Sequence, residues 1–354
     1  MSVSTSDNRG KTGARLAVTP ALGWAAAAAA VAGLILWALG IGRYPIPAGD
    51  VALILLSKLV PIEPGWSDSA ERVVMLVRLP RILGAALAGA ALGATGAALQ
   101  GIFRNPLVGP QIIGVTAGAS FGGALAILLF GTALATMGAA FAGGLLAVVL
   151  VYGVARPGQL PSVLTLVLAG VVVSAGFTAL VGLLKYVADP NDTLPAIVYW
   201  LMGSFAMMTY AKLAVIAAST LVGVGLLWAL WFRINVLSLG EEEASAIGMA
   251  VEPVRWIVLA AVALAVAGVV AVAGVVGWVG LVVPHIARML VGPNHRALIP
   301  ASALIGAGYL VVMDTLARAL TMAEIPIGIL TALIGAPVFA LLLYRLSLKG
   351  WARQ

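Results

Sequence analysis

The sequence contains no cysteine, and His285 and His295 are its only histidines. Without cysteine, the chain cannot form a disulfide, a thiolate nucleophile, a Cys-ligated zinc site or an iron–sulfur cluster. The two histidines lie ten residues apart and have no paired carboxylates near them, so they do not predict a metal site. We therefore expect neither a metal nor a cofactor.

Charge is also scarce. Only 9% of the 354 residues are charged and 62% are hydrophobic, and the mean hydropathy is +1.11. Ordinary soluble domains are about one quarter charged, and so few charges cannot cover the surface of a soluble fold of this length. This composition excludes soluble globular, disordered, fibrous, coiled-coil and nucleic-acid-binding proteins. In a membrane protein, an excess of positive charge such as this net +7 usually comes from cytoplasmic loops that lie beside anionic lipid.

Long apolar stretches dominate the chain and predict an all-α membrane protein. A shorter stretch at 194–206 predicts a half-helix near an interface rather than a crossing. We expect a cytoplasmic tail over 1–20, a transmembrane domain over 21–346 and a second cytoplasmic tail over 347–354. The ten expected crossings are 21–41, 79–102, 111–131, 133–154, 163–186, 211–232, 255–276, 278–291, 298–320 and 327–346.

The distribution of basic residues orients these crossings. Ten crossings leave both termini on one side, and placing the termini inside puts twelve of the 20 Lys and Arg residues in the cytoplasm. The other eight gather mainly in one long loop, 43–81, and long loops follow the charge rule less closely. We therefore predict that both termini are cytoplasmic.

Motifs for enzyme chemistry are missing. Gly10-Lys11-Thr12 resembles the end of a phosphate-binding loop, but Thr5 stands where the first glycine is required and no strand precedes it. The sequence has no nucleophile elbow and no HExxH motif. We assign no catalytic residue and predict that this chain is not an enzyme.

Charged residues within apolar stretches often mark a transport path. Asp314 and Arg318 lie four residues apart on one predicted helix, so they can neutralise each other or serve a function. Lys185 lies at the end of a stretch, where its side chain can reach the interface. An ion-coupled carrier would usually have a carboxylate at mid-membrane, and Asp314 lies near a stretch end. This pattern disfavours, but keeps open, an ion-coupled secondary transporter or a channel.

A short polar segment between two crossings, residues 239–249, carries three consecutive carboxylates. Glu241, Glu242 and Glu243 would occupy the first turn of a helix, where the helix dipole favours negative charge, and Gly248 would end that helix. The segment is either a simple capped loop helix or a docking surface for a soluble partner.

The order of several motifs resembles the FecCD-type permeases, which are the membrane subunits of type II ABC importers for ferric siderophores, haem and vitamin B12. The similarity covers residues 30–346. The matching motifs are Arg78-Leu-Pro-Arg81, Asn105-Pro-Leu107, Gly114-Val-Thr-Ala-Gly118, Leu168-Ala-Gly170, Tyr199-Trp-Leu-Met-Gly203, the loop 240–248, Val279-Gly-Leu-Val-Val-Pro-His285, Asp314 to Arg318, Glu324-Ile-Pro-Ile-Gly328 and Gly335-Ala-Pro-Val338.

This resemblance implies a type II importer permease fold in the bacterial inner membrane, with ten transmembrane helices, additional short helices and no cofactor. It also implies a homodimer around a central path, two cytoplasmic ATPase subunits and a periplasmic substrate-binding protein, embedded in a lipid bilayer. The expected function is import of a metal chelate driven by ATP hydrolysis on the partner subunits. Whether that chelate is haem, a siderophore, cobalamin or another stays open.

The resemblance also assigns roles to individual residues. Asn105, Leu107 and Ser162 are expected at the cytoplasmic gate. Arg78, Arg81 and Arg318 are expected at the outer rim, where they would receive acidic residues of the binding protein. The helix that couples to the ATPase is expected to comprise Gly240, Glu241, Glu242, Glu243, Ala244, Ser245, Ala246, Ile247 and Gly248.

Overall fold

The computed structural model describes residues 20–155 and 163–351, which form helices and no strand. Its long helices are α1 (Pro20–Gly40), α4 (Leu79–Ile102), α5 (Val115–Phe130), α6 (Ala133–Ala155), α7 (Val163–Val187), α9 (Tyr210–Ala229), α12 (Val251–Ala273), α14 (His295–Ala319) and α15 (Ile327–Trp351). The shorter ones are α2 (Ala48–Leu56), α3 (Asp68–Arg72), the π-helix η1 (Val73–Arg78), the 3-10 helix η2 (Pro110–Ile113), α8 (Thr193–Met202), α10 (Trp231–Leu237), α11 (Glu241–Ala246) and α13 (Val279–Val291).

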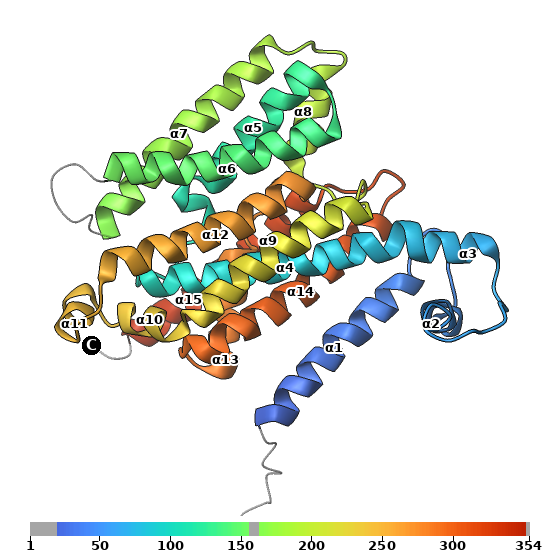
Figure 1. Ribbon diagram of the computed structural model, residues 1–354, viewed down its shortest axis with the longest axis horizontal. Helices are drawn as coiled ribbons and strands as arrows, with labels where there is room; N and C mark the ends of the chain where they lie inside the picture. Colours follow the sequence, from blue (N-terminus) through green and yellow to red (C-terminus); the bar gives the residue numbers. More distant parts are fainter. Residues whose placement is uncertain (1–19, 156–162, 352–354) are drawn as a thin grey trace, which may run out of the picture.

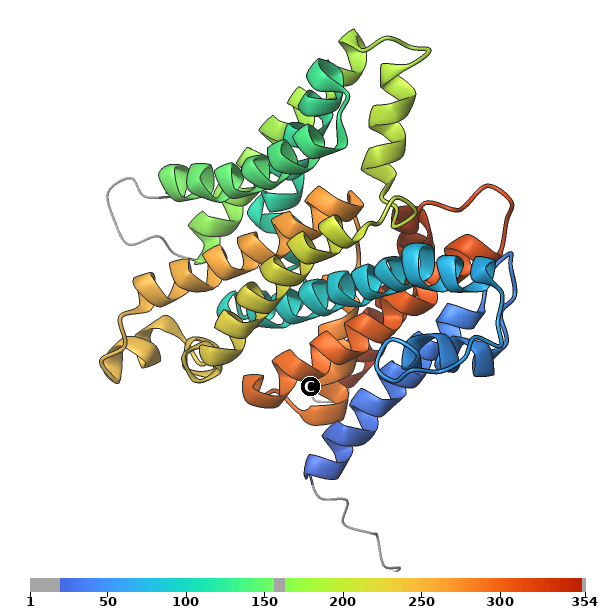
Figure 2. The same ribbon diagram turned by 45° about the vertical axis from the view of Figure 1, so that its right-hand side comes forward.

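Helices α4 and α12 form the centre of the bundle, and both are mostly buried. Helix α4 packs against α14, α9 and α13, while α12 packs against α9 and α6 (Figure 1). Helices α5 to α8 form a lobe on one side of α12, and α1 lies on the opposite side against α14 (Figure 2). Helices α2 and α3 lie at one end of the molecule and α10 and α11 at the other, and we call these the α3 end and the α11 end.

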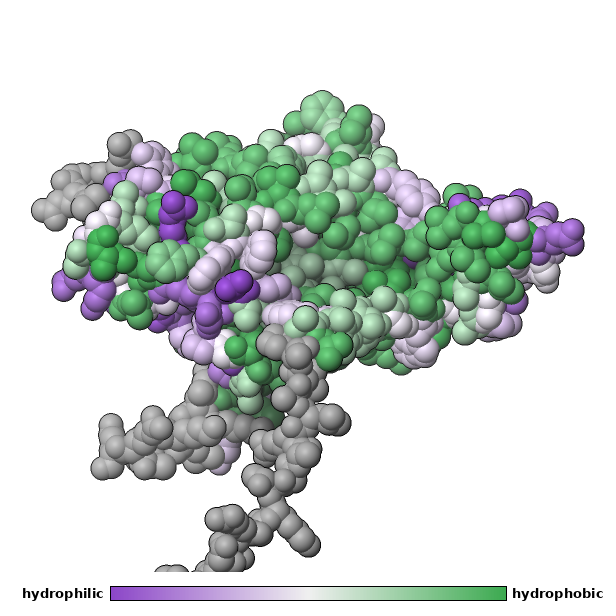
Figure 3. Space-filling view, turned by 60° about the horizontal axis from the view of Figure 1, so that its bottom comes forward, coloured by the Kyte–Doolittle hydropathy of each residue, from purple (hydrophilic) through white to green (hydrophobic). Residues whose placement is uncertain are grey.

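The surface agrees with a membrane-spanning body. Figure 3 shows a broad apolar surface over the middle of the molecule, with hydrophilic residues gathered toward its ends. Within the part of the chain that the structure describes, seven helices are long and apolar enough to cross a membrane. Helices α5 and α13 are shorter, and the 13 residues of α13 span about 20 Å, less than the roughly 30 Å hydrocarbon core. The exact count of ten crossings therefore remains a prediction.

Nine of the ten predicted stretches begin and end within four residues of an observed helix. Helix α4 has the predicted bounds, and the expected half-helix is α8. Helix α15 continues to Trp351, five residues beyond the predicted end of the last crossing. The expected loop 43–81 is largely helical, because Val51 and Ile54 of α2 are buried against the end of α1.

Glycines allow the central helices to touch through their backbones. A Cβ atom added to Gly89 would lie 2.0 Å from the carbonyl oxygen of Gly306, and one added to Gly93 would lie 2.2 Å from that of Ser302. Such distances are far below van der Waals contact, so any side chain on Gly89 would push α4 away from α14. A Cβ at Gly118 would similarly lie 2.3 Å from the carbonyl oxygen of Gly143, between α5 and α6. Close helix approach at such glycines is common in membrane bundles.

Candidate functional site

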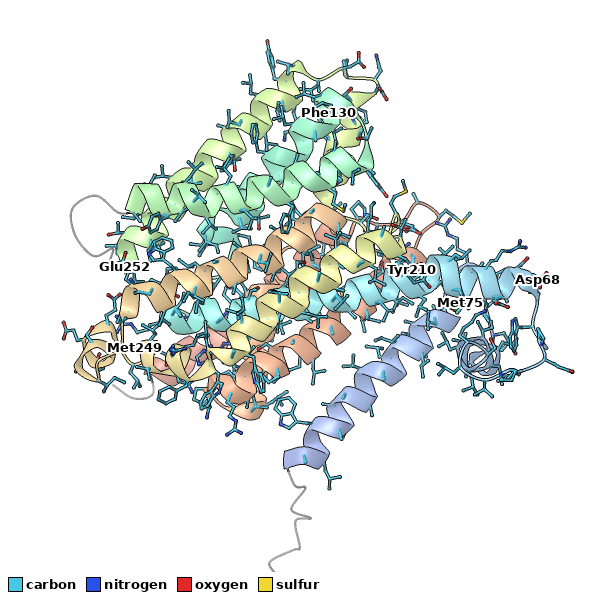
Figure 4. The ribbon with its side chains drawn as sticks, viewed as in Figure 1. Asp68, Met75, Phe130, Tyr210, Met249 and Glu252 are labelled. Carbon is cyan, nitrogen blue, oxygen red and sulfur yellow. The ribbon has the colours of Figure 1, made fainter. Side chains whose placement is uncertain are left out.

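The acidic helix α11 forms at the α11 end as the sequence predicts. Its first turn holds Glu241, Glu242 and Glu243, which are favoured at the positive end of a helix. Gly248 adopts a left-handed φ of +80° and donates its N–H to Ser245, which ends the helix. Figure 4 shows Met249 and Glu252 where the chain leaves α11 and enters α12.

One face of α11 is anchored and the other is free for contact. The carboxylate of Glu241 pairs with the buried guanidinium of Arg255 on α12, at 2.5 Å, and Ala244 is fully buried. Glu242 and Glu243 are exposed, and Leu239 and Ile247 are 69% and 65% exposed. Although it is short and surface-exposed, α11 is thus fixed to α12 and presents acidic and apolar side chains together. This combination suits a soluble partner.

The expected gate residues lie in a tight turn after α4. The side-chain oxygen of Asn105 accepts a hydrogen bond of 2.9 Å from the backbone N–H of Leu107, and both residues are exposed. Arg104 enters the turn with a φ of +49°, which is unusual for a residue with a side chain. The third expected gate residue, Ser162, lies outside the described residues.

A polar bridge joins the end of α4 to α13 beside this turn. The Gln100 side-chain amide donates to the backbone carbonyl of Leu281 at 3.3 Å, and Arg288 donates to the Gln100 side-chain oxygen at 3.1 Å. A Cβ on Gly280 would lie 2.7 Å from Pro110, so α13 also packs closely against η2. The turn that contains Asn105 and Leu107 is therefore held by contacts with α13 both before and after it.

The three arginines expected at the outer rim are buried, and their role in docking stays a prediction. Arg78, Arg81 and Arg318 are 5%, 6% and 6% exposed. They lie at the α3 end, where all three line one pocket together with Glu324. Their positions on either side of Pro80 predict that Arg78 and Arg81 lie at the rim. Burial results from partners in distant segments, which are backbone carbonyls for Arg78 and a buried carboxylate for Arg81.

Arg81 is the centre of a buried ion-pair network. It lies 2.9 Å from Asp314 on α14 and 2.9 Å from Glu324 in the loop after α14. Arg318 lies 3.7 Å from the same Asp314, so the predicted pairing of these two residues is confirmed and Arg81 is an additional partner. Asp314 is 1% exposed, and a buried carboxylate needs such partners. Glu324 belongs to a motif noted in the sequence, but spacing alone does not reveal its contact with Arg81.

The other two arginines cap the C-terminus of α1. Arg78 donates to the backbone carbonyls of Leu39 and Tyr44, and Arg318 donates to those of Ala38 and Ile41. Carbonyls at a helix C-terminus lack partners within the helix and carry partial negative charge, which cationic side chains stabilise. These arginines therefore join α1 to α4 and α14.

Backbone hydrogen bonds link α8, α12 and α15 near the α3 end. Ser204 donates its N–H to Ala273, and Ile327 donates its N–H to Gly203. Gly203 adopts a φ of +76°, and a Cβ there would lie 2.5 Å from the carbonyl oxygen of Val275. Motifs that are far apart in the sequence thus meet in one junction beside the half-helix α8.

The chain is similar to known transport proteins over nearly its whole length. The FecCD transport family model matches residues 30–345. The molybdate import permease MolB of Haemophilus influenzae is 46% identical over 88% of this chain and 92% of that protein. The cobalamin import permease BtuC of Halobacterium salinarum is 40% identical over 85% and 80%, and the hemin permease HmuU of Yersinia pestis is 37% identical over 79% and 85%.

A solved structure supports the same assignment. It is described as an inward-facing conformation of a metal-chelate type ABC transporter, and it superposes with a TM-score of 0.82 at 43% identity. The match covers 90% of this chain and 98% of that one. The chain is accordingly a transport subunit and not an enzyme. Its apolar helices, the acidic α11 and these similarities together show that it belongs to the FecCD transport family, as a multi-pass ABC importer permease.

Proposed function

We propose that this chain forms a homodimer that moves a metal-containing ligand across the bacterial inner membrane into the cytoplasm. In this proposal a periplasmic protein delivers the ligand, and ATP hydrolysis on two cytoplasmic subunits drives its passage. The observation that carries the proposal is α11, which presents Glu242, Glu243 and Ile247 while Glu241 is held by Arg255. An ATPase subunit with a basic and apolar groove would fit this surface.

This assignment orients the chain in the membrane. If α11 faces the ATPase, the α11 end is cytoplasmic and the α3 end is periplasmic. The turn with Asn105 and Leu107 then forms part of a cytoplasmic gate between the two copies. Both termini would be cytoplasmic, in accordance with the distribution of basic residues.

We place docking of the periplasmic binding protein at the α3 end. In this arrangement the buried arginines position the surface residues that the binding protein would contact. Arg81 holds Glu324, which is 29% exposed, and Arg43 donates to the carbonyls of Thr321 and Met322 in the same loop. Arg78, Arg81 and Arg318 thereby shape the surface. Glu324→Gln removes the partly exposed charge of this surface and keeps the shape of the side chain, so it should slow association with the binding protein more than it alters basal ATP hydrolysis. An unchanged association rate in this variant would refute the docking assignment.

The cargo class has two candidates. Metal chelates are the cargo named for several relatives, while molybdate, a metal oxyanion, is the cargo named for MolB. An ion-coupled carrier or a channel is the alternative mechanism. Co-purification with a separate ATPase subunit, and ATP hydrolysis that the binding protein stimulates, tests the proposal. An isolated chain that hydrolyses ATP, or one that fails to bind any ATPase subunit, would contradict it.

A further inference from the structure

The segment that leads into α11 is hydrogen-bonded to the start of α14. Only residues 238–240 separate α10 from α11, and α10 packs against α11, α4 and α14 (Figure 1). The side-chain oxygen of Asn235 on α10 accepts a hydrogen bond of 2.9 Å from the backbone N–H of His295, the first residue of α14. The same oxygen lies 2.7 Å from His295 Nδ1. An amide oxygen accepts and cannot donate, so the Nδ1 atom carries the proton of this second hydrogen bond.

These hydrogen bonds fix the orientation of the Asn235 amide. The backbone N–H of His295 can only donate, so the amide oxygen faces His295 and the amide nitrogen faces Asn294. That nitrogen donates to Asn294 Oδ1 at 2.9 Å. The same Oδ1 caps α14, because it accepts a hydrogen bond of 3.0 Å from the backbone N–H of Arg296. Three directional hydrogen bonds therefore join the Asn235 side chain of α10 to the first turn of α14.

The imidazole ring of His295 packs against the last turn of α4. His295 is 3% exposed, and a Cβ added to Gly101 of α4 would lie 2.4 Å from its Nε2 atom and 2.8 Å from its Cε1 atom. The same Cβ would lie 3.0 Å from Cγ2 of Ile234, so α10 also reaches Gly101 directly. Packed interiors transmit displacement because they contain few voids. A movement of α10 and His295 toward α4 would therefore displace the last turn of α4.

The turn that contains the proposed gate residues is bonded to this last turn of α4. The backbone N–H of Arg104 donates to the Gly101 carbonyl at 3.2 Å, and that of Asn105 donates to the Gln100 carbonyl at 3.3 Å. A continuous set of contacts thus runs from α11 through α10 and His295 to Asn105. Energetic coupling between distant sites is carried by such chains of packed side chains and hydrogen bonds.

We propose that Asn235 and His295 are positioning residues that transmit movement of α11 to the gate turn after α4. This inference rests on the proposed function, because it assumes that α11 docks on an ATPase subunit and that Asn105 lies at the gate. The Asn235 side chain holds the His295 ring between α10 and Gly101, so a displacement of α11 reaches the gate turn. Loss of this side chain uncouples the gate from ATP, while α11 itself and the gate residues stay unchanged.

The test uses the full chain assembled with its ATPase, and a spin label attached to Asn105→Cys before assembly, which is site-specific because the chain has no natural cysteine. Electron paramagnetic resonance measures the distance between the labels of the two copies, without nucleotide and with ATP plus vanadate. We expect ATP to shift the ratio of the two gate populations, and Asn235→Ala to make that shift about tenfold smaller while ATP hydrolysis continues.

Two further variants distinguish transmission from a merely structural role. Asn294→Ala is the matched control, because it removes the cap of α14 and one hydrogen bond of Asn235 but leaves both hydrogen bonds to His295. Asn235→Asp is the conservative variant, because a carboxylate accepts both hydrogen bonds from His295 but cannot donate to Asn294. Both variants should keep the response of the gate to ATP.

The outcomes separate this inference from the proposed function. A gate response in Asn235→Ala equal to that of the unmodified complex overturns the inference, and so does an equal loss in Asn294→Ala or Asn235→Asp. In these cases the importer function stands. An unmodified chain that binds no ATPase subunit overturns both.

A second variant decides if Asn235→Ala fails to assemble with the ATPase. His295→Ala keeps the backbone hydrogen bond to Asn235 and removes the ring from Gly101. A lost gate response in this variant, with ATP hydrolysis retained, supports the link. A gate response equal to that of the unmodified complex refutes it.

Discussion

Arg81 and Asp314 are 233 residues apart in the sequence, yet the Arg81 Nε atom lies 2.9 and 3.1 Å from the two Asp314 carboxylate oxygens. Both side chains are buried where α4 meets α14. This contact ties the two most closely packed central helices together at the α3 end. Arg81 also pairs with Glu324, and Asp314 also pairs with Arg318 on its own helix, so this network joins α4, α14 and the loop after α14.

Removing this carboxylate should destabilise the bundle strongly. Asp314→Ala leaves Arg81 and Arg318 buried without their shared partner, and breaking a buried pair in this way costs about 3–5 kcal/mol. Lys58→Ala is the matched control, because Lys58 pairs with Glu71 at the exposed surface, where a pair contributes about 0–1 kcal/mol. Thermal unfolding in detergent measures both variants. Equal midpoints for the two would contradict the importance of the network.

Glycine packing gives a second expectation about stability. Gly89→Ala places a methyl group against the Gly306 carbonyl oxygen and should cost about 1–3 kcal/mol or more, because the backbones must separate. Gly33→Ala is the control, since a Cβ at Gly33 on α1 meets nothing within 4 Å. A drop in the unfolding midpoint is expected for Gly89→Ala only. A variant at Gly89 as stable as the one at Gly33 would argue against tight packing of α4 on α14.

The exposed carboxylates of α11 should control ATPase docking. The variant Glu242→Lys/Glu243→Lys reverses two exposed charges and leaves the Glu241–Arg255 pair intact. Reversal also opposes the helix dipole, so we expect at least a tenfold loss in ATPase affinity with the membrane bundle still folded. Glu63→Lys, an exposed reversal before α3, should leave affinity unchanged. Normal assembly of the α11 variant would reject the docking role.

The absence of natural cysteine allows a direct test of the gate. Asn105→Cys should form a disulfide with the same residue of a second copy, because we place this exposed turn at the dimer axis. The yield should change with the nucleotide state of the complex. Leu22→Cys on the exposed face of α1 should show no such dependence. If Asn105→Cys never cross-links in any nucleotide state, the turn does not form the gate.

Local sequence features predicted the helices well and the long-range contacts poorly. The length of an apolar stretch indicates where a transmembrane helix begins and ends, and the predicted bounds of α4 are correct. The position of Gly248 likewise predicts the end of α11. Spacing of four residues also predicted the pair of Asp314 with Arg318. Nothing local indicates that Arg78 would cap α1 or that Arg81 would turn inward. Those contacts depend on how α1, α4 and α14 pack together, which single-sequence periodicity does not encode.

The segment between α1 and α4 shows the same limit. A loop is expected over 43–81, yet α2, α3 and η1 form there because a few buried apolar residues pack against α1 and α4. Tyr210 at the start of α9 adds a contact, since its hydroxyl donates to the Met75 carbonyl (Figure 4). Tertiary packing, rather than hydropathy, decides the structure of this segment.

The most direct measurement of the central claim is cargo uptake by sealed vesicles that contain this chain, its ATPase and its binding protein. The account predicts uptake that requires ATP, stops when the ATPase subunit is replaced by a hydrolysis-deficient variant, and continues when proton and sodium gradients are collapsed. Uptake that persists without ATP and follows an imposed ion gradient would contradict it and favour an ion-coupled carrier.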